Sequence, residues 1–326
     1  MNQPFITIAM PCLNEAAFIE NCIRSVQAQT YPRERIEILV ADGGSTDGTR
    51  GILDRLAAED HRIRVIDNPQ RIQAAGLNRA IGASRGEVIA RMDVHADYAE
   101  DYLEKCVEVL NRTGVDNVGG AARCRAQGKV QRAVAAALHS LLGFGGAAFR
   151  DSQAEGFVDT LFPGAFRREV FDKVGLFDEG AVTNEDAELN QRILQAGGRI
   201  YLSREIEVYY YPRDTLAGLA RQYYGYGQGR ARTLVKHRRF ARWRPALPFL
   251  GLVVAIVAAI VVPRLASVAV SGYVLAVAVE GMRMGWRFSA PVPLTCLAFP
   301  VMHFSHGLGF GVGLVRFLLR PDWQRR

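Results

Sequence analysis

A long stretch without charges near the C-terminus constrains this 326-residue chain most. Residues Ala246–Val262 contain no charged side chain, and as a helix they would extend about 25 Å, slightly less than the hydrocarbon core of a bilayer. Two further apolar segments follow, Leu265–Val279 and Phe288–Val315, with a predicted loop containing Arg283 and Arg287 between them. Three prolines interrupt the last segment. We expect a membrane-embedded helical hairpin and a third, irregular span or re-entrant piece. The alternative is a set of buried helices in a soluble domain.

Basic residues are concentrated directly before these apolar segments. The chain has 40 Lys and Arg and 33 Asp and Glu, giving a net charge of +7, but residues 1–220 alone are net negative. Residues 221–244 contain eight basic side chains and no acidic one, mixed with Tyr and Trp. This pattern is typical of a membrane interface with anionic lipid headgroups, so we expect no nucleic-acid partner.

The N-terminal sequence predicts where most of the chain lies. Residues 1–3 have no basic side chain, and the apolar run Phe5–Met10 is too short for a secretory signal, so residues 1–244 should stay in the cytosol. Five cysteines without a C-x-x-C pair indicate neither disulfides nor a zinc site. The distribution of arginines around the apolar segments favours an even number of membrane crossings, because basic loops stay in the cytoplasm.

Apolar runs of β type alternate with helical patterns over residues 1–130. The predicted strands are Phe5–Met10, Ile36–Val40, Ile63–Ile66, Val88–Met92 and Val115–Val118. The predicted helices are a segment from Ala16 to Val26 capped by Asn14, followed by Thr49–Ala58, Ile72–Ala83 and Glu100–Leu110. This alternation favours a mostly parallel sheet covered on both faces, with ligands at the carboxyl ends of the strands.

Polar residues follow three of the predicted strands. The motifs are Pro11-Cys12-Leu13-Asn14-Glu15, Ala41-Asp42-Gly43-Gly44-Ser45-Thr46-Asp47-Gly48-Thr49 and Arg91-Met92-Asp93-Val94-His95-Ala96-Asp97. In the second motif a carboxylate precedes glycines that let the backbone approach a ligand, which suits a nucleoside base and ribose. A capped turn alone would contain the same residue types. The glycine patterns of P-loop and dinucleotide-binding proteins are absent.

Asp93 and His95 form a candidate metal pair. Two ligand-type side chains at i and i+2 after a strand can converge on one divalent cation, which would bridge the diphosphate of a sugar nucleotide. The histidine favours Mn²⁺ over Mg²⁺. Alternatively, His95 is a polar loop residue, and Asp97 or Asp101 caps the following helix.

Together these motifs resemble glycosyltransferase family 2, which has the GT-A fold. The resemblance covers about residues 5–235 and rests on Pro11-x-x-Asn14-Glu15, the Asp42–Thr49 turn, Arg79, Gly86, Asp93-x-His95 and Asn184-Glu185-Asp186. The Asp93-x-His95 form and the segment Arg221–Arg232 are similar to bacterial exopolysaccharide enzymes of the succinoglycan type. Those enzymes add a sugar to an acceptor linked to polyprenyl diphosphate. The common family pattern has Asp-x-Asp where this chain has Asp93-x-His95.

The resemblance implies a role for each motif. Asp42 would contact the uracil or other base, and the nucleotide pocket would be formed by Pro11, Asn14, Glu15, Asp42, Gly43 and Asp93. Asp93 and His95 would hold the diphosphate through Mn²⁺ or Mg²⁺. Asp186 would be the base that takes the acceptor proton in an inverting transfer. Glu185 and Asp186 begin a helical run whose N-terminus favours an ionised Asp186, although the same residues are also an ordinary helix start.

Several downstream residues are weaker candidates for contacts to the acceptor or to a diphosphate. They are Glu185, Arg167, Arg168, Gln228, Arg230 and Arg232. Ordinary surface arginines, and a purely electrostatic anchor in residues 221–244, are the alternatives. The small apolar segment Leu138–Phe149 is expected against the bilayer.

These expectations combine into an α/β protein of three parts. A GT-A nucleotide-sugar-binding domain with a mostly parallel sheet (1–220) is followed by a basic and aromatic interfacial collar (221–244) and by transmembrane or membrane-embedded helices (245–326). The implied partners are a nucleotide-sugar donor, a polyprenyl-linked acceptor and the lipid bilayer. The implied location is a bacterial inner membrane, with the catalytic domain in the cytosol.

The expected activity is an inverting transfer of a sugar, from UDP in particular, to a saccharide linked to polyprenyl diphosphate. A polyprenyl-phosphate sugar synthase would instead use the lipid phosphate itself as acceptor. A processive polysaccharide synthase is suggested by Arg239–Trp243, which matches a [QR]-x-x-R-W pattern, but two or three short spans hardly form a secretion channel. A catalytically inactive membrane scaffold is the fourth reading, and the intact Asp42, Asp93 and Asp186 argue against it.

Overall fold

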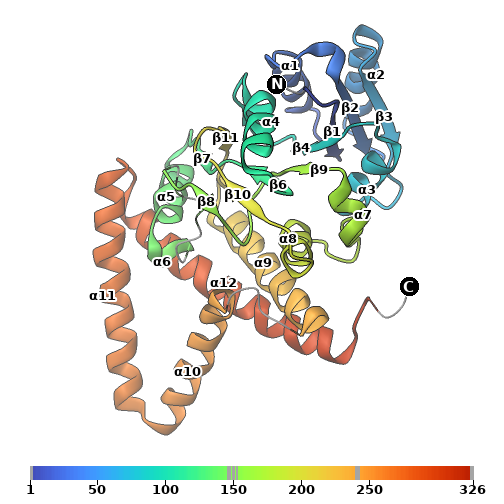
Figure 1. Cartoon of the computed structure of the whole chain (residues 1–326). Coiled ribbons are helices and arrows are strands. Elements are labelled where there is room, and N and C mark those ends of the chain that lie inside the picture. Colours follow the sequence, from blue (N-terminus) through green and yellow to red (C-terminus); the bar gives the residue numbers. More distant parts are fainter. Residues whose placement is uncertain (1–2, 145–147, 149–150, 152, 239–242, 324–326) are drawn as a thin grey trace. The chain divides into compact units, whose positions relative to one another are not determined.

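The computed structural model of the chain describes residues 3–144, 148, 151, 153–238 and 243–323. It contains two compact units (Figure 1). The first consists of residues 1–123 and 151–210, and the second of residues 124–150 and 211–326. The longer segment of the second unit therefore begins ten residues before the predicted collar, and its shorter segment, residues 124–150, falls within the predicted first domain.

The first unit is built around an eight-stranded sheet. Its strands lie in the order β3-β2-β1-β4-β9-β6-β10-β8. They span Ile6–Cys12 (β1), Ile36–Asp42 (β2), Ile63–Asp67 (β3), Val88–Arg91 (β4), Asn117–Gly119 (β6), Gly156–Phe157 (β8), Ala165–Arg167 (β9) and Ile200–Leu202 (β10). The pairs β1/β2, β1/β4, β2/β3 and β6/β10 are parallel, whereas β9 runs antiparallel to both of its neighbours. The predicted mostly parallel sheet is confirmed.

Buried apolar side chains explain the central strands. All seven residues of β2 are buried, as are six of the seven in β1, because helices cover a parallel sheet on both faces. Ile8 and Ile38 belong to a continuous core with Leu53 and Leu56 of the helix that follows β2. The interior of the sheet is therefore apolar, and polar groups gather beyond the carboxyl ends of its strands.

The predicted helices of the first unit are present, although the first begins later than expected, and a short helix at Glu169–Val174 was not predicted. The helices of this unit span Ile19–Gln27 (α1), Thr49–Glu59 (α2), Gln73–Ala83 (α3), Tyr102–Thr113 (α4), Glu169–Val174 (α7) and Glu185–Gln195 (α8), with a 3-10 turn at Arg33–Arg35. The predicted cap at Asn14 is wrong, because α1 begins only at Ile19. Asn14 has a φ of 56° and uses its side chain in the candidate site described below.

A small second sheet completes this part of the chain. Its strands are Ala96–Tyr98 (β5), Val208–Tyr210 (β11) and Ala122–Cys124 (β7), in the order β5-β11-β7. β5 and β11 pair antiparallel, with Tyr98 opposite Val208. β5 follows directly after Asp93 and His95, so the small sheet fixes the loop that carries them.

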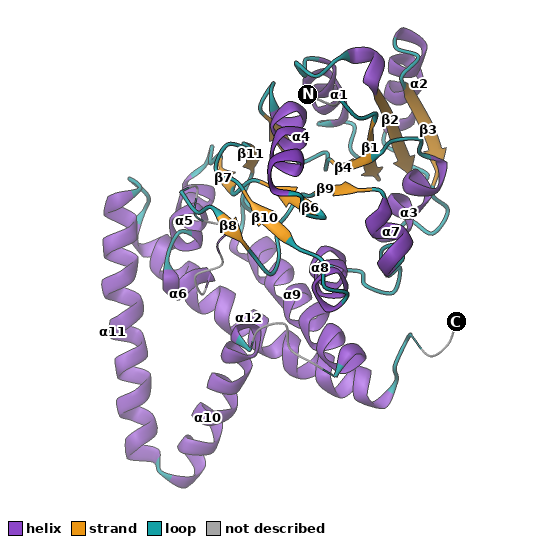
Figure 2. Ribbon diagram, viewed as in Figure 1, coloured by secondary structure: helices purple, strands orange, loops and turns teal. Residues whose placement is uncertain are grey.

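The second unit is helical (Figure 2). Its helices are Lys129–Leu138 (α5), Leu141–Phe144 (α6), Leu216–His237 (α9), Leu247–Val261 (α10), Pro263–Arg287 (α11) and Val292–Leu319 (α12), with a 3-10 turn at Arg244–Ala246. Within the described residues, three helical segments are long and apolar enough to cross a membrane: Arg244–Val261, Pro263–Arg287 and Val292–Leu319. The predicted apolar helices after residue 244 are thus present.

The structure corrects two details of the apolar region. The third segment is one continuous helix, α12, and not an irregular piece. Pro291 and Pro293 lie at the start of α12, where a missing N–H breaks no helical hydrogen bond, and Pro300 is accommodated inside the helix. Arg283 and Arg287 belong to α11 and not to a loop, so only residues 288–291 connect α11 to α12.

Most of the predicted collar is helical. Residues 221–237 form the larger part of α9. Residues 239–242, which make up most of the [QR]-x-x-R-W match, lie outside the described residues, as do parts of the segment Leu138–Phe149.

Candidate active site

The candidate site lies at the carboxyl ends of β1, β2 and β4. Cys12 at the end of β1 pairs in register with Asp42 at the end of β2. β4 runs parallel to β1 and ends at Arg91, two residues before Asp93. Parallel pairing therefore brings the three polar motifs of the sequence to one edge of the sheet.

Asp42 is fixed by the turn that follows it. Its side chain is 1% exposed, and its Oδ1 accepts hydrogen bonds from the Ser45 hydroxyl at 2.6 Å and the Ser45 N–H at 3.2 Å. The guanidinium of Arg50 lies 3.7 Å from Oδ2. Gly44 and Gly48 have φ angles of +73° and +98°, which explains why this turn needs glycine at those positions.

The loop after β1 is joined to this turn by hydrogen bonds. The N–H of Asn14 donates to the Ser45 hydroxyl at 2.8 Å, and the N–H of Thr46 donates to the Asn14 side-chain oxygen at 2.9 Å. The N–H of Glu15 donates to the Thr49 hydroxyl at 2.7 Å. The structure thus brings Asn14 and Glu15 beside the turn that carries Asp42.

Pro11, near the end of β1, and Gly43, directly after β2, lie at the same edge of the sheet. Pro11 pairs in register with Ala41, and the N–H of Gly43 donates to the Cys12 carbonyl at 2.8 Å. A Cβ at Gly43 would approach the Leu13 side chain to 3.1 Å, so a larger residue there would press on the loop that carries Asn14.

A buried arginine connects Asp93 to the start of α8. Arg91 holds Asp93 with two parallel contacts, Nε to Oδ1 at 2.9 Å and Nη2 to Oδ2 at 3.0 Å. Its Nη1 lies 2.9 Å from the Glu185 carboxylate, and its guanidinium lies 4.9 Å from the centre of the Phe162 ring. The Arg91 side chain is only 4% exposed. One buried cation therefore joins two carboxylates that are far apart in the sequence. We call Arg91, Asp93 and Glu185 the Arg91 group.

The electrostatics of this group follow from its burial. Burial alone would lower the pKa of Arg91, but the carboxylates of Asp93 and Glu185 outweigh it and hold this pKa above its ordinary value. Burial raises the pKa of Glu185 to about 7, with the Asp186 carboxylate adding to the rise and Arg91 opposing it. Glu185 therefore changes its charge near neutral pH.

Asp186 lies in the first turn of α8, next to Glu185. It is half-buried, and among the residues that the structure describes its carboxylate has no hydrogen-bond partner. Asn184, which precedes this turn, has a φ of 59°. The Asp186 carboxylate is therefore accessible to a bound molecule beside Arg91 and Glu185.

His95 contacts Glu15. Its Nε2 lies 2.8 Å from the Glu15 carboxylate, and its ring packs edge-on against Phe18 at 4.7 Å between centres. Asp93 is held by Arg91 and accepts a further hydrogen bond from the Gln73 amide at 3.3 Å. Among the described residues, no group of three or more His, Cys, Asp or Glu side chains is placed to hold a metal ion.

The residues present nevertheless fit a divalent cation bound together with a diphosphate. Mg²⁺ and Mn²⁺ are commonly held by one or two protein ligands while phosphate and water oxygens complete the shell. Asp93 and His95 supply one oxygen and one nitrogen, and their side chains are 16% and 57% exposed, so a ligand can reach them.

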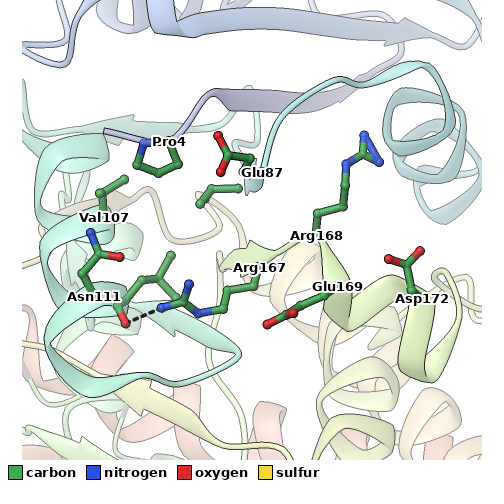
Figure 3. Close-up of a pocket in the computed structure, with 10 residues that line it drawn as sticks. Pro4, Glu87, Val107, Asn111, Arg167, Arg168, Glu169 and Asp172 are labelled. Carbon is green, nitrogen blue, oxygen red and sulfur yellow. Dashed lines mark hydrogen bonds between the residues drawn. The ribbon is translucent and has the colours of Figure 1, made fainter. Parts of the chain in front are cut away.

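Arg167 and Arg168 are not part of this edge of the sheet. Arg167 pairs with Val88 at the start of β4, because β9 is antiparallel to β4, whereas Asp93 follows the other end of β4. Both arginines line a cavity of about 350 Å³ beside Pro4, shown in Figure 3. The Arg167 guanidinium donates to backbone carbonyls of Leu110 and Val115, so the predicted acceptor contact does not match its position.

Gln228, Arg230 and Arg232 lie on α9 in the second unit. Arg232 is 3% exposed and forms an ion pair with Asp322 at 2.9 Å, with its guanidinium over the Trp323 ring. Its role within the second unit is thus to bind the segment after α12.

Sequence reasoning missed two residues of the site, Arg91 and Gln73. Both contact Asp93, but Arg91 lies in a predicted strand and Gln73 in a predicted helix, and no role was predicted for either residue. An arginine at the end of an otherwise apolar strand, Val88-Ile89-Ala90-Arg91, was the available signal, because such a position is buried and requires a carboxylate partner.

Comparison with known proteins identifies the family. Residues 7–175 match the sequence model of glycosyl transferase family 2. The chain is 38% identical to the succinoglycan biosynthesis protein ExoA of Rhizobium meliloti (strain 1021) over 317 residues, which cover 96% of each chain. The chain belongs to glycosyl transferase family 2. It is therefore a glycosyltransferase, as the motifs predict.

More distant relatives of this glycosyltransferase agree in length and fold. It is 24% identical over 322 residues to a Methanococcus voltae enzyme named dolichyl N-acetyl-alpha-D-glucosaminyl phosphate 3-beta-D-2,3-diacetamido-2,3-dideoxy-beta-D-glucuronosyltransferase, covering 96% of this chain and 98% of the other. A mannosyltransferase of Pyrobaculum calidifontis, solved with GDP-Man and Mn²⁺, aligns with a TM-score of 0.59 and 21% identity over 100% of this chain and 89% of that chain. The latter likeness concerns the fold, and it confirms the predicted GT-A architecture.

Proposed function

We propose that this glycosyltransferase transfers a sugar from a nucleotide sugar, a UDP-sugar in particular, to a saccharide linked to polyprenyl diphosphate. The transfer inverts the configuration at the anomeric carbon. It takes place in exopolysaccharide biosynthesis, at the cytoplasmic face of a bacterial inner membrane. The observation that carries the proposal is the Arg91 group, which gathers Asp93 and the Glu185-Asp186 pair at the same sheet edge as Asp42.

The donor side of the proposal rests on the joined loops after β1 and β2. Asp42 is held rigidly by Ser45, so its carboxylate can accept hydrogen bonds from a base without reorganising. Asn14 and Glu15 are held beside it through Ser45 and Thr49. A nucleoside bound there would direct its diphosphate along the same edge of the sheet, where Asp93 and His95 follow β4.

Asp93 and His95 would hold a divalent cation, Mn²⁺ or Mg²⁺. When bound, the cation neutralises charge on the leaving nucleoside diphosphate. Arg91 and Glu15, the present partners of these two side chains, orient them at the sheet edge. The Mn²⁺ bound to the Pyrobaculum calidifontis protein supports this assignment.

Asp186 would act as the base on the acceptor. An inverting transfer needs one carboxylate to accept the proton of the attacking hydroxyl, on the face of the sugar opposite the leaving diphosphate. Asp186 stands at the start of α8, and Arg91 links its neighbour Glu185 to Asp93, which would serve the leaving group. The proton passes from the acceptor oxygen to the Asp186 carboxylate as the new glycosidic bond forms.

A membrane-bound acceptor agrees with the apolar helices of the second unit. The name of the Methanococcus voltae relative describes transfer to a sugar on a dolichyl phosphate lipid, and ExoA is named for succinoglycan biosynthesis. A lipid-linked saccharide stays at the membrane surface. An enzyme attached there through α10 and α11 therefore reaches its acceptor while the acceptor remains in the membrane.

A transfer assay tests the proposal. The full chain in detergent would be offered a panel of sugar nucleotides with polyprenyl-diphosphate saccharides or with polyprenyl phosphate, with Mn²⁺, Mg²⁺ or EDTA, and the products read by mass and by anomeric NMR. We expect a single added sugar on the diphosphate-linked saccharide, of inverted configuration, and loss of turnover in EDTA. Transfer to polyprenyl phosphate alone, or retention of configuration, would contradict the proposal.

A further inference from the structure

The three apolar helices of the second unit differ in how their surfaces are exposed. In α10 no residue is buried, and five consecutive residues, Val253–Val257, are all exposed, so exposed apolar side chains face all directions around the helix. α11 is similarly exposed between Leu265 and Val279. A helix that is apolar on all sides requires an apolar environment on all sides.

α12 has a different pattern, with exposed apolar residues on one side only. They are Leu297, Phe304, Leu308, Val312, Val315, Leu318 and Leu319, separated by seven, four, four, three, three and one residues. This spacing places them in a single stripe along the helix. From its first to its last member the stripe extends about 33 Å.

The opposite side of α12 is covered by other helices of the second unit. Gly309 packs against the Tyr224 carbonyl and Gly313 against Gln228, both in α9, so closely that neither glycine position could carry a Cβ without displacement. The contact is parallel, because later residues of α12 meet later residues of α9 and Asp322 pairs with Arg232. α9 thus follows α12 for most of its length.

α9 is too basic to enter a bilayer beside α12. It contains Arg221, Arg230, Arg232 and Lys236. If α12 crossed the hydrocarbon core, the parallel contact at Gly309 and Gly313 would place Arg221 near the middle of α12 and Arg230 about 14 Å further along it. Charged side chains at the bilayer centre are unfavourable, and they are found where a water-filled cavity or a buried partner serves a function.

The open end of the hairpin formed by α10 and α11 packs against α12. A Cβ at Gly307 would meet the Pro248 carbonyl at the start of α10, and a Cβ at Gly281, near the end of α11, would approach the Cys296 backbone to 3.0 Å. These two contacts are 11 residues apart on α12, about 16 Å. Figure 1 shows α12 running across the open end of the α10–α11 pair.

We propose that α12 does not cross the membrane but lies along its surface, with the Leu297–Leu319 stripe in the lipid and α9 covering its other side. Only the α10–α11 hairpin then enters the hydrocarbon core. This inference rests on the proposed attachment to a membrane and specifies its geometry. The surface that it assigns to the bilayer consists of the whole hairpin and one side of α12.

The distribution of basic residues agrees with this arrangement. The tip of the hairpin carries one, Arg264, whereas its base and α12 carry Arg283, Arg287, Arg316 and Arg320. Basic residues favour the cytoplasmic side, so both ends of the hairpin and both ends of α12 belong on that side. An even number of crossings then results, although three helices are long enough to cross.

Nitroxide depth measurements test the proposal on the full chain in liposomes of phosphatidylethanolamine and phosphatidylglycerol. Labels would be introduced one at a time at Phe304, Leu308, Val312 and Val315, in a Cys124→Ser, Cys296→Ser background. Labels at Val253, Val257 and Ile260 of α10 serve as the matched control. Accessibility to oxygen and to a water-soluble nickel complex gives the depth of each label.

We expect one constant depth along the α12 stripe and a depth that increases steadily from Val253 to Ile260. A maximum depth in the middle of α12, with shallower positions at both ends, would overturn the inference while leaving membrane attachment intact. Equal exposure of both helices to the nickel complex would overturn the attachment as well.

The sidedness of the C-terminus provides an independent test. Green fluorescent protein and alkaline phosphatase would be fused in turn to the C-terminus of the full chain in bacterial cells, with N-terminal fusions as the reference. We expect fluorescence from both ends and no phosphatase activity from either. Phosphatase activity from the C-terminal fusion alone would show a third crossing and would overturn the inference.

Discussion

The two halves of the candidate site are held together in different ways. The donor half, around Asp42, is fixed by short hydrogen bonds among residues of adjacent loops, mainly through Ser45 and Thr49. The reaction half, around Asp93 and Glu185, is fixed by a single buried cation, Arg91. Local hydrogen bonds can be lost one at a time at small cost, whereas removing a buried charge leaves its partners uncompensated. The reaction half should therefore be the more sensitive of the two.

The largest expected effect is on turnover, from Asp186→Asn. The asparagine keeps the shape of the side chain and its place in the first turn of α8 but cannot accept a proton. General-base catalysis contributes about 10² to 10⁴-fold, so kcat should fall by that factor. The Kd for the sugar nucleotide, measured by calorimetry, should stay within about twofold, because the donor half is unchanged. A kcat of the variant within a few-fold of the wild-type value would show that Asp186 is not the base.

Arg91→Met should have the largest effect on stability. It leaves the carboxylates of Asp93 and Glu185 without their cation, and breaking a buried pair costs about 3–5 kcal/mol. We expect a marked fall in Tm, partly restored by adding Glu185→Gln, and loss of turnover in both variants.

Arg62→Met is the matched control, because Arg62 forms a comparably buried ion pair with Asp60 at 2.6 Å just before β3, away from the carboxyl edge. It should lower the Tm but preserve kcat in the folded fraction. Equal losses of kcat in the Arg91 and Arg62 variants would mean that Arg91 acts through stability alone.

The Glu185 carboxyl makes the stability of the reaction half depend on pH. Its pKa is about 7 in the folded protein against an ordinary value of 4.5, so the unfolded chain releases this proton first as pH rises. The contribution of Glu185 to stability is therefore greatest below pH 4.5 and declines as the pH rises to about 7. The difference in Tm between wild type and Glu185→Gln, measured from pH 4.5 to 8, should follow this decline. A difference that does not change with pH would show that Glu185 is not shifted.

The smallest effect is expected in the donor half, from Ser45→Ala. The substitution removes the hydroxyl that bonds Asp42 and receives the Asn14 N–H, each bond being worth about 1 kcal/mol. The KM for the sugar nucleotide should rise roughly five- to thirtyfold while kcat changes little. Ser25→Ala, which removes a hydroxyl that donates to the Cys22 carbonyl within α1, is the control. A fall in kcat comparable to that of Asp186→Asn would contradict the expectation that the reaction half is the more sensitive of the two.

The sequence by itself determined the strands β1 to β4 and the loops around Asp42. Apolar runs such as Ile36–Val40 predict buried strands, and residues directly after a strand must lie at its carboxyl edge, so Asp42, Asp93 and His95 could be placed without coordinates. The Asp42–Thr49 turn is local, since its glycines and hydroxyls act on neighbouring residues. The apolar helices after residue 244 were likewise predictable from hydropathy and length.

Only the tertiary structure decided which distant side chains meet. Arg91 and Glu185 are 94 residues apart, and their pairing depends on where α8 packs, which no local pattern encodes. Arg167 and Arg168 were misplaced because β9 runs antiparallel to β4 and carries them to the opposite end of the sheet. Similarly, length and hydropathy describe α12 as a span, whereas its contact with the basic helix α9 points to the membrane surface. Hydropathy and turn chemistry depend on neighbours in the chain, but buried ion pairs and helix contacts depend on neighbours in space.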